Sequence, residues 1–254
     1  MGADRDRKLN APETTERFDI AVIGGGAAGL MAAISAATAA QEQDLDIRMV
    51  ILEAQERVGR KLLATGNGRC NLSHVNWEPE HYHGREPRFA LGALKRLDVA
   101  PTLDVFRQMG LLCRADEDGR IFPYSLQASS VLDILRLRLE RLGVLTQTSF
   151  KIDRLTASAT AHGTFHLHST DDRSLLAKSV IVATGGLAAP SFGCDGSGYG
   201  LMTRLGHRLI EPFPAIVQIC TPQAWVRPLS GIKCDGVASL VVDGQIRRVR
   251  KSVV

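Results

Sequence analysis

The stretch Phe18–Gly29, FDIAVIGGGAAG, decides the fold of this chain. Its apolar run with the β-branched residues Ile20, Val22 and Ile23 is typical of a buried strand. Three glycines follow at once, and a helical pattern covers Leu30–Ala40. The stretch therefore predicts a strand, a tight glycine turn and a helix in direct succession.

The turn has glycines at the spacing G-x-G-x-x-G, with Gly24, Gly26 and Gly29 separated by small residues that include Ala27 and Ala28. Gly24 permits the tight turn, Gly26 lets the backbone approach a pyrophosphate, and Gly29 lets helix and strand pack closely. The helix N-terminus offers unpaired N–H groups to an anion. The chemistry predicted at this junction is phosphate binding.

A second apolar run, Ile47–Leu52, ends in Glu53, a carboxylate placed to accept hydrogen bonds from an adenosine ribose. Glu53 comes 24 residues after Gly29, later than the usual interval of about 20, because the polar segment 41–46 lengthens the connection. The alternative is a glycine-rich turn followed by a glutamate that has no binding role.

Length and composition limit the classes of protein that remain. The 254 residues are 44% hydrophobic and 23% charged, and a net charge of +4 is too small and dispersed to indicate nucleic-acid binding. No apolar run reaches the roughly 20 residues of a membrane span, and residues 1–17 resemble a charged, flexible tail without a signal peptide. We expect a cytoplasmic protein. Five widely spaced cysteines indicate neither a disulfide framework nor a zinc site, so we expect reduced thiols.

After Glu53, residues 54–73 are rich in glycine, asparagine and paired cations. We interpret them as a loop that crosses the bound dinucleotide. Arg60 and Lys61 can neutralise phosphate, and the Gly66, Asn67 and Gly68 run offers bare N–H groups and unusual backbone angles. A plain surface loop is the alternative, and a helix can still include residues 57–63.

Four separated motifs make the sequence recognisable. They are GGGAAG at 24–29, GRKLLATGNGRCNLS at 59–73, GRIFPYSLQAS at 119–129 and VIVATGGLAAPSFGCDGSGYG at 180–200. Together they resemble the NAD(P)/FAD-dependent oxidoreductase family of BaiN-like flavoproteins, which is also described as aminoacetone oxidase-like and includes 3-dehydro-bile-acid Δ4,6-reductases. The resemblance extends from about residue 18 to about residue 244.

The resemblance implies an α/β fold: a Rossmann-like FAD-binding domain with a doubly wound, mostly parallel sheet, and the start of an inserted β-rich domain. It implies FAD as the cofactor of the first glycine turn. It adds Ala54 and Arg69 to the expected site, and the backbone of Ile152 beside the adenine. The strand 175–182 runs into Ala183, Thr184 and Gly185, and in many FAD enzymes of this fold such an ATG lies against the dinucleotide.

Other elements follow from periodicity and turn signals. We expect helices at 89–97, 101–109, 131–142 and 199–205, a hairpin from 111–114 and 120–124, and strands at 144–148, 150–155, 163–168 and 175–182. Asp195 can act on substrate or cap the helix that follows it. The histidine pairs 81 with 83 and 166 with 168 lack a third ligand, and we expect no metal site.

After residue 206 the sequence becomes richer in proline and in short β-type apolar runs. We expect a flexible tail at 1–17, the FAD-binding domain at 18–206 and an incomplete β-rich cover domain at 207–254, with strands at 215–220 and 237–242 and a turn at Asp243 and Gly244. The resemblance implies that family members continue beyond residue 254 with a segment that contacts the flavin, so we expect a truncated chain.

Three functional hypotheses remain open on the sequence. The first is an FAD-dependent oxidoreductase that passes hydride between NAD(P)H and an organic small molecule, such as an enone, with no catalytic acid or base assigned. The second is a truncated, non-catalytic flavin- or nucleotide-binding fragment. The third is an NAD-dependent dehydrogenase that uses Glu53. The oligomeric state does not follow from the sequence.

Overall fold

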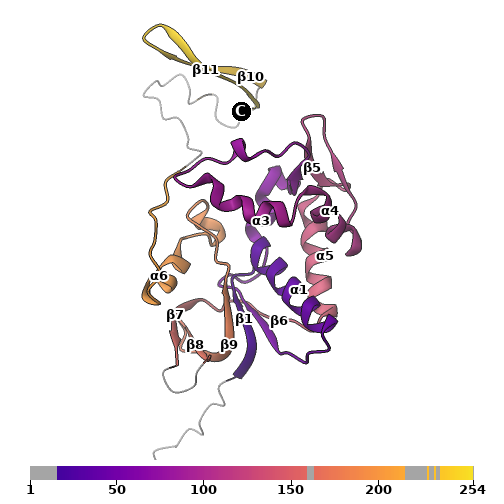
Figure 1. Ribbon diagram of the computed structural model, residues 1–254, viewed down its shortest axis with the longest axis vertical. Helices are drawn as coiled ribbons and strands as arrows, with labels where there is room; N and C mark the ends of the chain where they lie inside the picture. Colours follow the sequence, from indigo (N-terminus) through magenta and orange to yellow (C-terminus); the bar gives the residue numbers. More distant parts are fainter. Residues whose placement is uncertain (1–15, 159–162, 215–227, 229–231, 233–234, 254) are drawn as a thin grey trace, which may run out of the picture. The chain divides into compact units, whose positions relative to one another are not determined.

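The computed structural model describes residues 16–158, 163–214, 228, 232 and 235–253, and Figure 1 traces the chain. By its internal contacts the chain divides into two compact units, residues 1–212 and 213–254. The first unit carries the glycine turn and the main sheet. The division falls six residues beyond the predicted boundary after residue 206.

Six strands of the first unit form one sheet in the order β6-β2-β1-β9-β8-β7. Strands β1, β2, β6 and β9 are parallel, and β7 and β8 extend the sheet antiparallel beyond β9. The bounds are Glu16–Ile23 (β1), Met49–Leu52 (β2), Leu145–Gln147 (β6), Ile152–Ala157 (β7), Phe165–Ser169 (β8) and Ser174–Val182 (β9). The mostly parallel sheet of the predicted Rossmann-like fold is confirmed.

Helices α1 (Ala27–Glu42) and α5 (Ala128–Arg141) contact each other and cover one face of the parallel strands (Figure 1). Helix α6 (Ser197–Arg204) contacts β7 and packs Leu201 into the core of the other face. The remaining helices are α2 (Arg60–Ala64), α3 (Leu91–Arg96) and α4 (Val99–Gln108), with single 3₁₀ turns at Thr65–Gly68, Pro79–His81, Pro87–Ala90 and Pro190–Phe192.

Strand β1 is buried between two hydrophobic cores. Val22 packs into the core under α1 and α5 with Leu30, whereas Ala21 and Ile23 pack into the opposite core with Leu167. Successive side chains of a strand point to opposite faces, so a strand that is covered on both faces needs a continuous apolar run. This is why the run before Gly24 contains no polar residue after Asp19.

Three further strands of the first unit form a small antiparallel sheet in the order β3-β5-β4. Its strands are Ser73–His74 (β3), Cys113–Ala115 (β4) and Arg120–Pro123 (β5), and the hairpin predicted around the DEDG turn is confirmed. Gly119 closes that turn with φ of +84°, a conformation that glycine adopts without a steric cost.

The second unit contains a two-stranded antiparallel sheet of β10 (Asp235–Val242) and β11 (Gln245–Val253). Asp243 and Gly244 connect the strands, with φ of +51° and +74°. Two successive residues with positive φ form the turn that best matches the twist of a hairpin. The predicted turn is confirmed here, while the strand predicted at 215–220 lies outside the described residues.

Most differences from the predicted elements are shifts of their ends. Glu16 and Arg17, which we expected in the flexible tail, belong to β1 and pair with Leu175 and Leu176 of β9. Helix α1 begins at Ala27 rather than Leu30 because the helix already winds through the small residues of the glycine motif. Within the described residues, no helix is both long and apolar enough to cross a membrane.

Replacing Gly29 by alanine tests the contact between α1 and β1. A Cβ on Gly29 would overlap the Gly24 carbonyl oxygen, which belongs to backbone and cannot move aside cheaply. We expect Gly29→Ala to lower the free energy of unfolding by about 1–3 kcal/mol or more, although alanine is the better helix former. Chemical denaturation measures the change.

Gly200→Ala in α6 is the matched control, because a Cβ on Gly200 would meet no atom within 4 Å. This variant should be neutral or more stable by up to about 1 kcal/mol. Equal stability of Gly29→Ala and the natural chain would contradict the packing described here.

Candidate functional site

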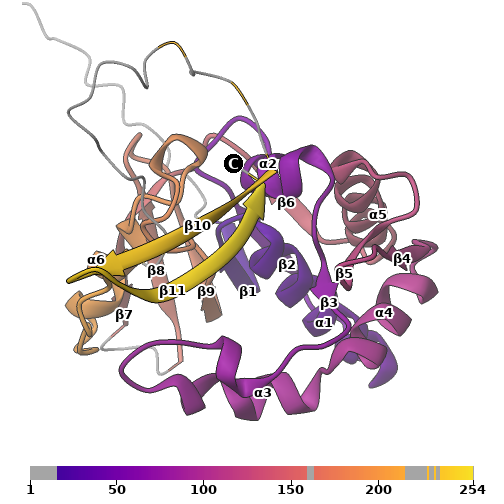
Figure 2. The ribbon, with the colours of Figure 1, turned by 90° about the horizontal axis from the view of Figure 1, so that it is seen from above.

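A cavity of about 500 Å³ opens at the carboxyl ends of three adjacent parallel strands. Gly24 follows β1, Glu53 follows β2 and Ala183 follows β9, and all three residues line the cavity. Figure 2 looks down on this end of the sheet, where β1 lies between β2 and β9. In open parallel sheets, ligands bind at the carboxyl ends of the strands.

Most of the predicted site residues line this cavity, and five do not. The lining residues are Gly24, Gly26, Ala27, Ala28, Glu53, Ala54, Arg60, Lys61, Ile152, Ala183, Thr184 and Gly185. Gly29, Gly66, Asn67, Gly68 and Arg69 are not among the lining residues. The roles of all seventeen residues in holding a cofactor stay predictions.

The glycine turn is as tight as its spacing predicts. Gly24 has φ of +107°, and a Cβ on it would lie 2.5 Å from the Ala183 carbonyl oxygen. A Cβ on Gly26 would meet no protein atom within 4 Å, so the space beside Gly26 is open. Gly26 is the N-cap of α1 and makes no side-chain hydrogen bond. Gly26, Ala27 and Ala28 line the cavity at this uncapped helix N-terminus.

Glu53 joins the ends of β1 and β2. One carboxylate oxygen accepts a hydrogen bond from the Gly25 N–H at 2.7 Å, and the other accepts from the Gln55 N–H at 2.8 Å. A carboxylate has about four acceptor positions, so two bonds leave capacity for the hydroxyls of a ligand. The sequence located this side chain correctly at the cavity but did not reveal its backbone partners.

Arg60 and Lys61 bring positive charge to the cavity from the first turn of α2. Gly59, with φ of +74°, redirects the chain into this helix, and a Cβ there would lie 2.5 Å from a Leu132 methyl group. Arg60 also donates to the Gln55 side chain. For residues 54–73 we predicted a loop, with a helix over 57–63 as an alternative. The structure contains a short helix here, over Arg60–Ala64.

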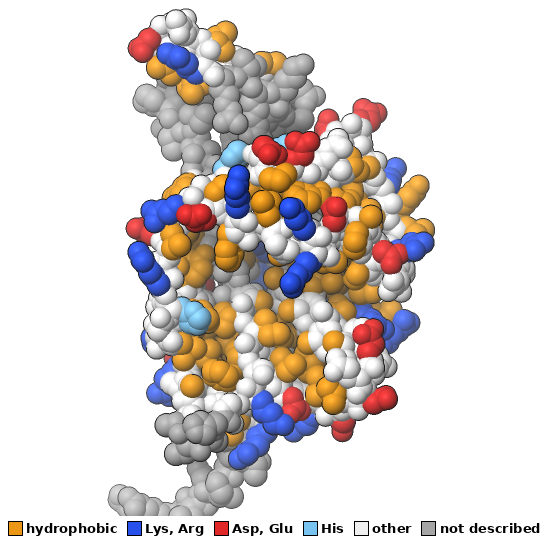
Figure 3. All heavy atoms as spheres, viewed as in Figure 1, with side chains coloured by type: hydrophobic (Ala, Val, Ile, Leu, Met, Phe, Trp, Pro, Cys, Tyr) orange, Lys and Arg blue, Asp and Glu red, His pale blue; other side chains and the backbone are white. Residues whose placement is uncertain are grey.

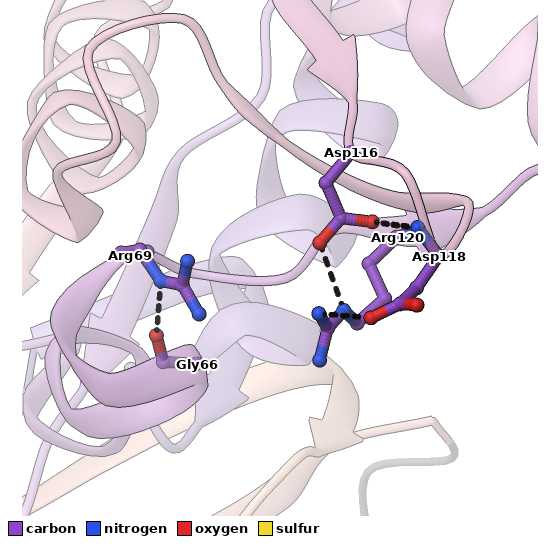
Figure 4. Close-up of polar contacts among 5 residues, drawn as sticks. All are labelled: Gly66, Arg69, Asp116, Asp118 and Arg120. Atoms are coloured by element: carbon purple, nitrogen blue, oxygen red, sulfur yellow. Dashed lines mark hydrogen bonds and ion pairs between the residues drawn. The ribbon is translucent and has the colours of Figure 1, made fainter. Parts of the chain in front are cut away.

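The Gly66–Arg69 run has the unusual backbone angles that we expected, with φ of +56°, +55° and +80° at Gly66, Asn67 and Gly68. Arg69 donates to the Gly66 carbonyl oxygen at 3.1 Å (Figure 4). Its guanidinium group lies 4.6 Å from the centre of the Phe122 ring. These contacts direct Arg69 toward the small sheet rather than into the cavity.

Arg120 lies in the motif at 119–129 but does not line the cavity. It forms ion pairs with Asp116 at 2.9 Å and Asp118 at 2.6 Å within its own hairpin (Figure 4). The hydrogen bonds and charge of Arg120 hold the pKa of Asp116 below its ordinary value despite desolvation, which acts in the opposite direction. Arg120 therefore stabilises the turn rather than lining the cavity.

The second glycine junction forms the wall of the cavity opposite Glu53 and α2. The Ala183 N–H donates to the Ile23 carbonyl oxygen at 2.8 Å, which fixes the start of this junction to β1. Gly185 has φ of +75°, and a Cβ on it would lie 2.9 Å from the Cys194 sulfur. Ile152, the first residue of β7, also lines the cavity.

Asp195 lies one residue before Gly196, the N-cap of α6, and bonds the first N–H group of that helix, as expected for the capping role of the two that we predicted. Its carboxylate accepts a hydrogen bond from the Ser197 N–H at 3.0 Å at the start of α6, and Lys151 lies 3.4 Å from its other oxygen. The Ser197 hydroxyl and backbone hydrogen bonds hold the pKa of Asp195 below its ordinary value, with a smaller contribution from Lys151.

The cavity also contains residues that the sequence did not single out. Thr65, Cys70, Asn71 and Lys151 contribute polar groups, and burial raises the pKa of the Cys70 thiol. The apolar side includes Phe106. Cys70 and Asn71 belong to the motif at 59–73, which could have indicated them from the sequence. Phe106 and Lys151 reach the cavity only through tertiary packing.

The cavity fits a dinucleotide cofactor of the FAD type. An open glycine position and an uncapped helix N-terminus suit a pyrophosphate, four cationic residues (Arg57, Arg60, Lys61 and Lys151) line the cavity, and a carboxylate with free acceptor capacity suits a ribose. Among the described residues, no group of three or more His, Cys, Asp or Glu side chains is arranged to hold a metal ion. The face in Figure 3 mixes cationic, anionic and apolar side chains.

Comparison with known proteins identifies relatives by sequence. The family described as HI0933-like protein Rossmann domain matches residues 18–249. A 3-dehydro-bile acid delta(4,6)-reductase of Clostridium scindens is 38% identical over 89% of this chain and 53% of its own length. A ribosomal RNA dihydrouridine synthase of Escherichia coli is 27% identical over 89% of this chain and 54% of its own length. The chain thus spans about half the length of the curated relatives that it matches.

Solved structures resemble this chain only distantly. A 3-ketosteroid-delta4-(5alpha)-dehydrogenase of Rhodococcus jostii is 15% identical, with a TM-score of 0.47 over 68% of this chain and 47% of the other. Thermovibrio ammonificans THI4 is 16% identical, with a TM-score of 0.43 over 66% and 58%. Both scores lie below 0.5, so the assignment rests on the sequence matches. The chain belongs to the HI0933-like Rossmann-domain family.

Proposed function

We propose that this protein binds FAD in the cavity at the carboxyl ends of β1, β2 and β9 and uses it as an oxidoreductase. In the proposed reaction, hydride passes between NAD(P)H and an organic small molecule. The observation that carries the proposal is the convergence of Gly24, Glu53 and Ala183 at one cavity, each directly after a parallel strand. The family assignment supports FAD as the occupant.

The chain's own residues have distinct parts in this proposal. The open position at Gly26 and the N–H groups of Ala27 and Ala28 would receive the pyrophosphate, with Arg60 and Lys61 balancing its charge. When bound, FAD supplies the hydride-accepting and hydride-donating centre. The protein would supply binding, orientation and exclusion of water.

Glu53 would hold the adenosine ribose, because its carboxylate is already oriented by the Gly25 and Gln55 N–H groups. Ile152 would border the adenine with its backbone, and the junction at Ala183, Thr184 and Gly185 would lie against the dinucleotide. We assign no residue as the acid or base of the reaction.

A small organic substrate is proposed on the strength of one relative. The Clostridium scindens reductase is named for a bile acid and is the more similar of the two relatives described above. The sequence has a single complete G-x-G-x-x-G motif. Within these 254 residues, then, the only glycine turn of this kind is the one assigned to FAD.

The first experiment is an absorption spectrum of the purified protein, before and after incubation with FAD and gel filtration. We expect flavin bands to remain with the protein at close to one FAD per chain. An assay of NAD(P)H oxidation follows, first with oxygen and then with enone acceptors. Protein that stays colourless would contradict the proposal, and retained flavin that NAD(P)H does not reduce would contradict the assigned reductant.

Gly26→Ala separates cofactor binding from folding. A Cβ at this position meets no protein atom within 4 Å, so we expect the free energy of unfolding of the apoprotein to change by less than about 1 kcal/mol. The methyl group would occupy the space that we assign to the pyrophosphate. We expect FAD affinity to fall by about ten-fold or more, which corresponds to about 1.4 kcal/mol, as measured by fluorescence titration.

Gly200→Ala serves again as the control, since its added methyl group also meets open space but lies outside the cavity. It should bind FAD like the natural chain. A Gly26→Ala protein that binds FAD with unchanged affinity would contradict the proposed place of the pyrophosphate.

Glu53→Gln tests the carboxylate. The Gly25 and Gln55 N–H groups bond to separate carboxylate oxygens of Glu53, and in glutamine one of these positions becomes an NH₂ donor that would face an N–H group instead of accepting from it. Hydrogen bonds to a charged group contribute about 1.5–3 kcal/mol each, so we expect FAD to bind at least about ten-fold more weakly. Isothermal titration calorimetry measures the affinity.

The control for this change is Glu56→Gln, because Glu56 is an exposed neighbour that does not line the cavity. It removes the same charge three residues away and should leave the affinity within about two-fold, as expected for a screened surface charge. Equal losses in the two variants would indicate a general charge effect and overturn the assigned role of Glu53.

A further inference from the structure

The backbone of Arg60 is fixed beside the glycine turn. The Gly59 N–H donates a hydrogen bond to the Gly25 carbonyl oxygen at 2.8 Å. Arg60 follows as the first residue of α2 and lines the proposed cofactor cavity. A long arginine side chain still has many rotamers when only its backbone is fixed. A further contact is therefore needed to direct its guanidinium group.

Gln55 supplies that contact. The Arg60 Nη1 group donates to the Gln55 side-chain oxygen, and within the described part of the chain this is the one hydrogen bond of the Arg60 side chain. Arg60 also forms no ion pair with a described carboxylate, whereas Arg107 and Arg120 are both paired with aspartates. The acceptor that orients Arg60 is thus a neutral amide.

A neutral acceptor has a different effect on an arginine from that of a carboxylate. A carboxylate would orient the guanidinium group and also compensate its positive charge. The amide oxygen of Gln55 carries no net charge, so the full charge of Arg60 and its remaining N–H groups stay available to an anion. This is the arrangement that a phosphate-binding arginine requires.

Gln55 is itself held on three sides. Its N–H donates to one carboxylate oxygen of Glu53 at 2.8 Å, and its carbonyl oxygen accepts from the Ser149 N–H at 2.8 Å. Its side chain lies beside Gly193, where an added Cβ would be 3.4 Å from the Gln55 Cγ and Nε2 atoms. Gln55 does not line the cavity, so it acts on an occupant only through its neighbours.

We propose that Gln55 is a positioning residue that makes the site selective for an adenosine diphosphate group over adenosine alone. Its side chain orients the Arg60 guanidinium group toward the diphosphate, and its backbone N–H orients the Glu53 carboxylate toward the ribose. One residue thereby sets the separation of the two groups that recognise the ligand. This inference rests on the proposed function, because it takes the cavity as the FAD site.

Gln55→Met tests the side chain. Methionine has a similar length and keeps the backbone N–H that bonds Glu53, but it lacks the amide oxygen. The probes are ADP and adenosine, each titrated into the apoprotein by isothermal titration calorimetry. We expect ADP to bind about three- to ten-fold more weakly, since an unheld Arg60 side chain must be ordered on binding, and adenosine affinity to stay within about two-fold. Equal losses for both ligands would indicate a structural role and overturn the proposal.

A double-mutant cycle with Arg60→Ala tests the route of the effect. Without the guanidinium group, Gln55 has nothing to orient, so Gln55→Met should change the ADP affinity of the Arg60→Ala protein by less than about two-fold. The same loss in both backgrounds would overturn the proposal, because Gln55 would then act independently of Arg60.

Gln55→Glu tests the need for a neutral acceptor. A glutamate at this position can still accept from Arg60, but it adds a negative charge that compensates the guanidinium group and repels a diphosphate. We expect ADP to bind at least about ten-fold more weakly than it does to the natural chain, a loss that corresponds to one factor of ten in the dissociation constant. Unchanged ADP affinity would overturn the proposal, since the free charge of Arg60 would then have no part in binding.

Gln108→Met is the matched control. Gln108 is an exposed residue of α4 whose side-chain amide donates to Asp104 at 2.6 Å, and it does not line the cavity. The variant loses a side-chain hydrogen bond of the same kind and should keep its ADP affinity within about two-fold. A natural chain that binds neither FAD nor ADP would overturn the proposed function together with this inference. ADP binding that Gln55→Met leaves unchanged would overturn this inference alone.

Discussion

The approach of helix α1 to strand β1 is the constraint on which the rest of this structure depends. Gly29 brings the helix against the Gly24 carbonyl oxygen, where no side chain has room. Because the helix starts immediately after the strand, its N-terminus opens at the sheet end rather than over a face. The same contact lets Leu30 and Val22 share a core. The cavity and one of the two hydrophobic cores therefore arise from a single close contact.

Much of the fold and part of the site could be predicted because they are encoded locally. The strand, turn and helix around Gly24–Gly29 occupy consecutive residues, and so do the DEDG hairpin and the turn at Asp243 and Gly244. Glu53 and Ala183 were found because each ends an apolar run. In a parallel sheet such positions meet at one end, so topology alone brought these residues to the cavity.

The remaining features depend on partners that are distant in sequence. Arg69 lies in a motif beside the site, yet it stacks over Phe122 of the small sheet, and no local pattern distinguishes a stacked arginine from one that binds phosphate. Lys151 and Phe106 line the cavity although neither belongs to a glycine motif. Strand β1 also begins earlier than predicted, at Glu16. Glu16 pairs with Leu175 of β9, a partner that is distant in sequence.

The junction of Ala183, Thr184 and Gly185 is a partition with a cavity on each side. A wall of three residues has few conformations, and Gly198 fixes it from behind because a Cβ there would overlap the Thr184 side chain. A ligand in either cavity would therefore contact the same three residues. If one ligand altered their conformation, thermodynamic linkage would require the two ligands to change each other's affinity by the same factor.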